Sequence, residues 1–281
     1  MPKTREKNFI RRSLVLGGPR SWGLLPSLKA PDLTSRRLTI FFSFSTRSII
    51  MNNIQYRRTV PEDAQVLKNL VPNVFYKREP LGNALTIRPS VEAIATVSDR
   101  IVHATVESPD NLSIVAVDNT YKGNPRSIVG FILARPMCSP DPFGDMSEFA
   151  DPTMFPILEV IDRIHLEVEE EFPGFHDMSD ATNFEIVGVV DEYLTRGIVK
   201  DMAIVAGDEL LKAGYKKAVF ATASENIKVT SSNWVGAHII HSLDLKAFEM
   251  KGAKVFTNVK NEVLQLVVLD YSQGRRTNAK L

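Results

Sequence analysis

The chain has 281 residues, of which 44% are hydrophobic and 24% charged, a composition that can bury a substantial core in one large or two small domains. No stretch approaches the roughly 18 to 20 uninterrupted apolar residues that cross a bilayer, so a membrane-spanning protein is not expected. The single cysteine, Cys138, has no partner for a disulfide or a metal cage and no nearby histidine pattern to activate it.

Charge is distributed unevenly along the chain. Residues 1–50 contain ten Lys or Arg and two Asp or Glu, whereas the rest contains 24 basic and 31 acidic residues. This leader is rich in Ser and Arg, and arginines flank an apolar run at 38–44, a composition typical of a mitochondrial presequence. The alternative is a disordered or isoform-specific extension before a cytoplasmic domain that begins at Met51. The acidic remainder lacks a basic stripe interleaved with aromatic residues, so no nucleic acid partner is expected.

Beyond Asn53, strand and helix patterns take turns along the chain, which is typical of an α/β domain. In chain order, the expected elements are a strand at 54–59, a helix at 61–70, a loop or helix junction at 75–81, a helix at 91–103, strands at 113–117 and 128–135, an irregular segment at 137–152, a helix at 154–172, a strand at 184–190, a helix at 198–213, a strand at 218–222, a helix at 234–243 and strands at 254–257 and 263–269.

Prolines and apolar runs set the boundaries of these elements. Pro61, followed by two acidic residues, opens the first helix, and Pro72 is expected to break it. The run at 184–190 is almost continuously apolar, so it predicts a central strand buried on both faces. The pattern predicts one domain of mixed sheet and helices over residues 51–275, followed by a tail at 276–281.

The strand, loop and helix at 184–213 form the most informative unit. Gly197 precedes the helix and allows close approach of a ligand to the backbone. The first turn of a helix leaves N–H groups unpaired at the positive end of its dipole and can hold a pyrophosphate. A purely structural turn explains the same residues, because a glycine between a strand and a helix is common.

The order of the elements and the loop sequence together resemble a known family. The motif Val-x-x-x-Tyr-Arg-Gly-Arg-Gly-Ile-Gly of the GNAT superfamily of N-acetyltransferases is matched by Val189, Tyr193, Arg196, Gly197 and Ile198. The chain departs from the motif at Leu194, Thr195 and Val199. The resemblance implies an α/β (α+β) fold with a six- to seven-stranded, mixed and mainly antiparallel sheet, helices on both faces, and a splay at the central strand.

The resemblance implies acetyl-CoA as the acyl donor and no metal ion. A backbone N–H near 187–189 would polarise the thioester carbonyl, and the N–H groups of the loop would hold the pyrophosphate. Arg196 and Lys200 either meet the phosphates of CoA or are surface charges. The residues implied for the cofactor are Val187, Gly188, Val189, Leu194, Thr195, Arg196, Gly197, Ile198 and Val199.

A second motif narrows the resemblance to one group of enzymes. The sequence Phe75-x-x-x-Glu79-Pro80-Leu81 is similar to the signature of the arylalkylamine (dopamine-type) N-acetyltransferases. This similarity makes Glu79 the general base, which removes the proton of an alkylammonium before its nitrogen attacks the thioester. From the residues alone, a solvated or helix-capping acid beside Pro80 is the alternative. The implied partners are a small-molecule amine and acetyl-CoA, in a monomer or weak dimer.

A later segment departs further from the family. Residues 236–245 fall where the family has a motif on its last long helix, and they match it only in part. Ile240 stands in the place of a tyrosine that protonates the leaving thiolate in many relatives. Together with Leu194, Val199 and Asp244, this departure supports an alternative function. The alternative is a GNAT-like domain that has lost catalysis and binds an acyl-CoA or a protein partner.

Two further clusters have weaker patterns. His238 and His241 are three residues apart on an expected helix, but no third metal ligand is evident, so structural or surface roles are expected. The second cluster is acidic and either attracts cationic amines or forms a solvated loop. It consists of Asp141, Asp145, Glu148 and Asp151.

Overall fold

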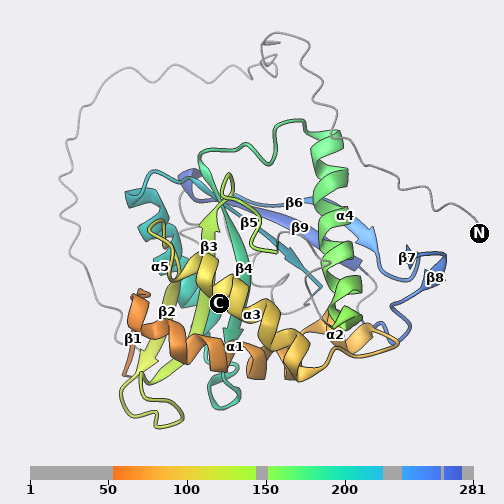
Figure 1. Cartoon of the computed structure of the whole chain (residues 1–281). Coiled ribbons are helices and arrows are strands. Elements are labelled where there is room, and N and C mark those ends of the chain that lie inside the picture. Colours follow the sequence, from red (N-terminus) through yellow and green to blue (C-terminus); the bar gives the residue numbers. More distant parts are fainter. Residues whose placement is uncertain (1–52, 144–150, 224–235, 261–262, 274–281) are drawn as a thin grey trace, which may run out of the picture. The chain divides into compact units, whose positions relative to one another are not determined.

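The computed structural model describes residues 53–143, 151–223, 236–260 and 263–273 (Figure 1). The leader at 1–50 and the tail at 276–281 lie outside these ranges, and the expectations for them stay predictions. None of the helices in the described ranges combines the length and the apolarity that a bilayer span requires.

A seven-stranded mixed sheet runs through the domain in the order β1-β2-β3-β4-β5-β9-β6 (Figure 1). Neighbouring strands are antiparallel except β4 and β5, which are parallel. The strands are β1 (Ile54–Arg58), β2 (Ile114–Asp118), β3 (Ile128–Pro136), β4 (Ala181–Val189), β5 (Lys217–Thr222), β6 (Ala237–Asp244) and β9 (Val263–Asp270), with a separate short pair, β7 (Glu249–Met250) and β8 (Ala253–Lys254). The mainly antiparallel mixed sheet expected from the sequence is confirmed.

Helices cover both faces of this sheet. A side chain at Gly130 would meet Ile198 of α5 at 3.1 Å, whereas one at Gly188, opposite Phe131, would meet Val74 of α1 at 3.0 Å. Because Gly130 and Phe131 are adjacent in β3 and point to opposite sides, α5 and α1 lie on opposite faces. The helices are α1 (Ala64–Arg78), α2 (Pro80–Ala84), α3 (Val91–Thr105), α4 (Phe155–Glu171) and α5 (Ile198–Lys212), with short 3-10 turns η1 (Pro61–Asp63), η3 (Pro152–Met154), η4 (Asp191–Tyr193) and η5 (Tyr271–Gln273).

The sheet opens between its two parallel strands. Residues 181–183 of β4 pair with residues 217–219 of β5, and beyond this point β4 continues to Val189 and, among the strands that the structure describes, pairs only with β3. One edge of β4 is therefore separated from β5 over the second half of the strand. The predicted splay at the central strand is confirmed.

The prediction that Pro72 ends the first helix near Leu70 is wrong, because α1 continues past Pro72. An internal proline removes one backbone hydrogen bond and costs about 3 kcal/mol. The helix buries Leu67, Val71 and Pro72 itself, and this packing offsets the local cost. As a result, the signature at 75–81 begins in the last helical turn and ends at the start of α2.

The helix predicted at 234–243 is also wrong, because residues 237–244 form strand β6; Trp234 lies outside the described residues. Ala237, Ile240 and Leu243 recur every three residues and imitate a helical stripe. The β-branched side chains and the antiparallel pairing with β9 favour an edge strand instead. Ile240 therefore lies in a strand rather than near a helix end, and the family motif compared at 236–245 does not fall on a helix.

Two smaller expectations for strands are corrected by the structure. At 254–257, Lys254 belongs to the two-residue strand β8, and Phe256 forms an isolated bridge with Leu85. Strand β4 begins before residue 184 and is not completely buried on both faces, because Glu185 and Val187 on one face keep some solvent exposure. These two side chains line the cavity that the splayed sheet creates.

Candidate active site

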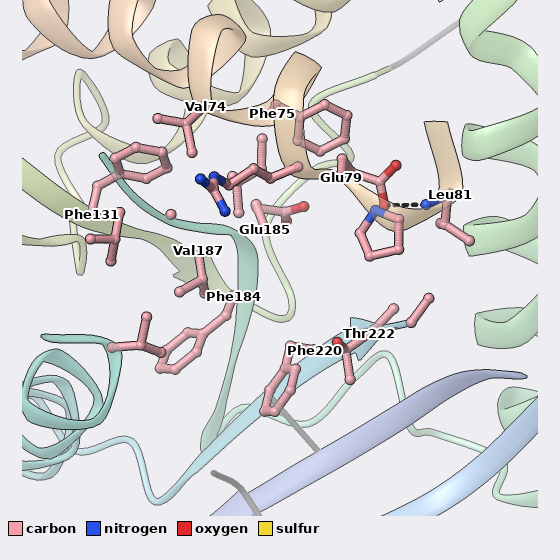
Figure 2. Close-up of a pocket in the computed structure, with 18 of the residues that line it drawn as sticks. Val74, Phe75, Glu79, Leu81, Phe131, Phe184, Glu185, Val187, Phe220 and Thr222 are labelled. Atoms are coloured by element: carbon pink, nitrogen blue, oxygen red, sulfur yellow. Dashed lines mark hydrogen bonds between the residues drawn. The ribbon is translucent and has the colours of Figure 1, made fainter. Parts of the chain in front are cut away.

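A cavity of about 740 Å³ opens beside the splayed strands (Figure 2). It is bounded by the junction of α1 and α2, by α4, by β4 and β5, and by the first turn of α5. Most of its wall is apolar, and several of the side chains are aromatic, including Phe75, Phe184 and Phe220. Few charged groups of the described residues face this cavity, so each of them is a candidate for chemistry.

The residues that the sequence assigned to the cofactor come together in this cavity, with one exception. Its wall includes Val187, Gly188, Val189, Leu194, Thr195, Gly197, Ile198 and Val199. Arg196 is exposed and is not part of the wall; its guanidinium lies over the ring of Tyr193, with Cζ 4.5 Å from the ring centroid. Lys200, in the first turn of α5, also lines the cavity.

The first turn of α5 presents backbone donors to this cavity. Gly197 is the N-cap residue, with a φ of 77°, and no side chain caps this helix within the described part of the chain. An added Cβ at Gly197 would meet open space, so the approach to the helix end is clear. Thr195 also has a positive φ, of 62°, which costs a non-glycine residue on the order of 1 kcal/mol. The strained loop and the uncapped helix together form a cradle suited to a phosphate.

The departures from the family motif do not fill the cavity. Leu194 and Val199 are half-buried, pack against the hydrophobic core and contribute to the cavity wall. Backbone N–H groups do not depend on side-chain identity, so the donors of the loop survive these substitutions. The edge of β4 that faces away from β3 lies in the same cavity and can donate and accept strand-like hydrogen bonds.

Glu79 lies at the junction of α1 and α2 and faces the same cavity (Figure 2). It is the N-cap of α2: Oε1 accepts a hydrogen bond from the backbone N–H of Leu81 at 2.9 Å, and Oε2 accepts one from that of Gly82. The capping role considered from the sequence is thus present together with a place in the cavity. Burial raises the pKa of Glu79 to about 7, against the opposing effect of its two backbone donors.

A carboxyl group with a pKa of about 7 is well matched to proton transfer at neutral pH. It is ionised in a large fraction of molecules and yet basic enough to accept a proton. The apolar wall that surrounds Glu79 supplies this property, because it disfavours the charged form. In chemical terms, the arrangement can accept a proton from a cation that enters the cavity.

A second carboxylate, which the sequence motifs did not predict, lines this cavity. Glu185 on β4 is almost fully buried, and its Oε1 accepts hydrogen bonds from Arg135 Nε at 2.5 Å and from Asn183 Nδ2 at 2.8 Å. Burial raises the pKa of Glu185, and the Arg135 guanidinium opposes this shift. One signal for it was present: Glu185 is the only charged residue in the apolar run at 184–190 and alternates with Val187 on one face of the strand.

A salt bridge connects the two ends of the site. Asp191 in η4 accepts from Arg78 Nε at 2.9 Å and from Lys77 Nζ at 3.4 Å. These cations end α1 directly before Glu79, so the loop before α5 is tied to the junction that carries this carboxylate. All three side chains are largely exposed, and such pairs contribute at most about 1 kcal/mol.

The other candidates lie elsewhere. His238 and His241 are on β6, and His241 Nε2 lies 2.9 Å from Glu167 Oε2 of α4. No group of three or more potential metal ligands occurs within the ranges that the structure describes. Asp151 caps η3, and Asp141 accepts from the N–H of Phe143. The remaining acidic residues of that cluster, Asp145 and Glu148, lie outside the described residues.

Comparisons with known proteins identify the fold. No family model and no curated protein sequence matches the chain. Among solved structures, the C-terminal condensation domain of Ebony in complex with beta-alanyl-dopamine is 12% identical, with a TM-score of 0.65, and the match covers 78% of this chain and 100% of that one. Arylalkylamine N-acetyltransferase 2 from Aedes aegypti is 17% identical, with a TM-score of 0.61 and coverages of 78% and 99%. The Drosophila melanogaster polyamine N-acetyltransferase is 16% identical, with a TM-score of 0.59 and coverages of 77% and 99%.

At these identities the likeness establishes the fold and nothing finer. The chain has the fold of the GNAT N-acetyltransferases, as the sequence resemblance implied. The structures that share it here include enzymes named for arylalkylamines and polyamines.

Proposed function

We propose that this chain is an acyl-CoA-dependent N-acyltransferase that moves an acetyl group from acetyl-CoA to a primary amine of the arylalkylamine or polyamine type. One observation carries the proposal: Glu79 and the residues of the phosphate-binding motif, more than 100 positions apart in sequence, line one cavity at the split of the sheet. The structural neighbours named for arylalkylamines and polyamines support an amine as the acceptor.

The proposed roles follow from the groups that each element presents. The first turn of α5 and the loop at 194–197 hold the pyrophosphate through backbone N–H groups. The free edge of β4, at 187–189, binds the pantetheine chain and offers an N–H to the thioester carbonyl. The residues proposed to hold acetyl-CoA are Val187, Gly188, Val189, Leu194, Thr195, Arg196, Gly197, Ile198 and Val199.

Glu79 is proposed as the general base for the amine. It takes the proton of the alkylammonium, and the neutral nitrogen then attacks the thioester carbonyl, so that an N–C bond forms and the C–S bond breaks. The nitrogen loses a second proton as the amide forms, the leaving thiolate gains one, and CoA is released as the free thiol. Positioning the two substrates in a largely apolar cavity supplies much of the rate, and proton removal typically adds 10²- to 10⁴-fold. Within this proposal the catalytic domain spans residues 51–275, and the leader at 1–50 takes no part in the chemistry.

The proposal predicts release of free CoA when the protein is mixed with acetyl-CoA and a suitable amine. A panel of dopamine, serotonin, tryptamine and spermidine covers the aromatic and polycationic acceptors, and a thiol reagent detects the product. Calorimetry with acetyl-CoA separates the alternatives. Binding without turnover on any amine would favour a GNAT-like domain that has lost catalysis, and absence of binding would contradict both cofactor-based functions.

A further inference from the structure

A buried aspartate, a tyrosine and an arginine form a stack next to the phosphate loop. Tyr193, the last residue of η4, donates a hydrogen bond from its hydroxyl to Asp118 Oδ2 at 2.9 Å. The guanidinium of Arg196 lies over the ring of Tyr193, with Cζ 4.5 Å from the ring centroid. Three elements are thus connected in order: the end of β2, η4 and the loop before α5.

The base of the stack is a fixed negative charge. Asp118 is 5% exposed, and its Oδ1 accepts hydrogen bonds from the backbone N–H and from the hydroxyl of Thr120. These donors, with the Tyr193 hydroxyl, hold the pKa of Asp118 below its usual range, so the carboxylate is ionised. Because Oδ1 is occupied by Thr120, Oδ2 points at Tyr193 and fixes the orientation of its ring.

Arg196 lies on this ring and outside the cavity wall. Leu194, Thr195 and Gly197 line the cavity, whereas Arg196 between them does not. Its side chain makes no hydrogen bond or salt bridge to any other residue that the structure describes, and the planar guanidinium keeps its N–H donors after stacking on an aromatic face. An arginine held in this way outside the cavity wall is presented to an anion beyond the cradle of α5.

We infer that Tyr193, oriented by Asp118, is a positioning residue that holds Arg196 ready to bind a phosphate of the donor's nucleotide half. The inference rests on the proposed function, since it assumes a CoA thioester as the donor. The backbone donors at Gly197 hold the pyrophosphate within the cradle, and Arg196, outside the cavity wall, is placed to bind either the 3′-phosphate or the outer side of the pyrophosphate. The stack therefore contacts the nucleotide end of the donor, whereas β4 binds the acyl end.

The test compares donors that differ in their phosphates: acetyl-CoA, 3′-dephospho-acetyl-CoA and S-acetylpantetheine. Tyr193→Phe keeps the ring and removes the bond to Asp118. We expect it to lower kcat/KM about 3- to 10-fold with acetyl-CoA, the usual net effect of losing one hydrogen bond, and to leave kcat/KM with S-acetylpantetheine within about twofold of the wild type. The 3′-dephospho donor shows which phosphate Arg196 binds. If Tyr193→Phe and the wild type have the same kcat/KM with this donor, Arg196 binds the 3′-phosphate. If the variant is still impaired, Arg196 binds the pyrophosphate.

Three further variants make the result independent of folding. Arg196→Gln changes an exposed side chain and is expected to give the same donor-selective loss of kcat/KM. The double variant should lose no more kcat/KM than Arg196→Gln alone, because both substitutions remove the same interaction. Tyr121→Phe is the control: Tyr121 packs edge-on against the Tyr193 ring, with centroids 5.6 Å apart, and should have wild-type activity.

Three outcomes would overturn the inference. Equal losses with acetyl-CoA and S-acetylpantetheine would mean that Tyr193 only supports the loop. Additive losses in the double variant would mean that Tyr193 and Arg196 act separately, and wild-type values with every donor would mean that the stack has no part in binding. Failure of the wild-type protein to use any CoA thioester is a different result, because it contradicts the proposed function and the inference with it.

Discussion

Substitution of Glu79 by Gln is expected to lower kcat/KM for the amine by about 10²- to 10⁴-fold, the usual contribution of a general base. Glutamine is isosteric, and its amide oxygen can still accept from the backbone of Leu81 or Gly82, so the cap of α2 is largely kept. Steady-state turnover with the best amine of the panel measures the loss. Calorimetry should give an unchanged Kd for acetyl-CoA.

The matched control is Glu62→Gln, which neutralises an exposed acid at the start of the domain. It should leave turnover unchanged. If Glu79→Gln also turned over like the wild type, Glu79 would cap α2 and have no part in the mechanism.

The same carboxyl group sets the pH dependence that accompanies this prediction. Burial raises the pKa of Glu79 to about 7, and only the ionised form can accept a proton. Since kcat/KM reports the free enzyme, it should rise with pH and level off above about pH 7, and Glu79→Gln should lack this limb. A limb that persisted in the variant would belong to another group, and Glu185 would be the first candidate.

Substitution of Phe131 by Ala is expected to lower the free energy of unfolding by about 3–5 kcal/mol, the usual loss for a fully buried phenylalanine. Phe131 is 0% exposed, and its ring packs against Gly188 so closely that an added Cβ there would lie 2.4 Å from Cζ. The cavity left behind cannot close easily, because β3 and β4 are held in register on both sides of the ring. Urea denaturation followed by circular dichroism measures the change.

Phe172→Ala provides the matched comparison, because Phe172 follows α4 and is 43% exposed. A change below about 1 kcal/mol is expected there. If Phe131→Ala were as stable as Phe172→Ala, the packing of β3 against β4 described above would be contradicted.

Much of the fold could be predicted because local pattern and tertiary structure agree there. The helix α5 has helical periodicity, and the strands β2 and β3 are short apolar runs joined by turn residues, so these elements occur where the sequence predicted them. The splay at β4 was implied by the family resemblance rather than by any local pattern. It is a property of two strands that start together and diverge after residue 183.

The errors occurred where tertiary packing overrides local preference. Pro72 would end an isolated helix, but α1 is held by its buried face. An apolar residue at every third position imitated a helix at 237–243, where the segment is an edge strand paired with β9. Neither the pairing partner nor the burial of α1 is encoded within the segments themselves.

In the site, too, short motifs identified individual residues, whereas the contacts between distant residues are seen only in the structure. Glu79 and Gly197 could be found because each belongs to a short motif, yet only the structure brings them to one cavity. The hydrogen bond from Tyr193 to Asp118 joins residues 75 positions apart, and no spacing rule predicts such a partner. Its long-range character explains why Tyr193 was recognised as a motif residue while its partner was not.

The central claim is that the free edge of β4 and the first turn of α5 hold coenzyme A. Amide hydrogen exchange with and without saturating CoA tests it most directly, because ligand binding covers those N–H groups. We predict slower exchange in peptides that cover residues 184–200 and unchanged exchange in those that cover β1 and β2. Protection elsewhere in the chain, with no change at 184–200, would contradict the account.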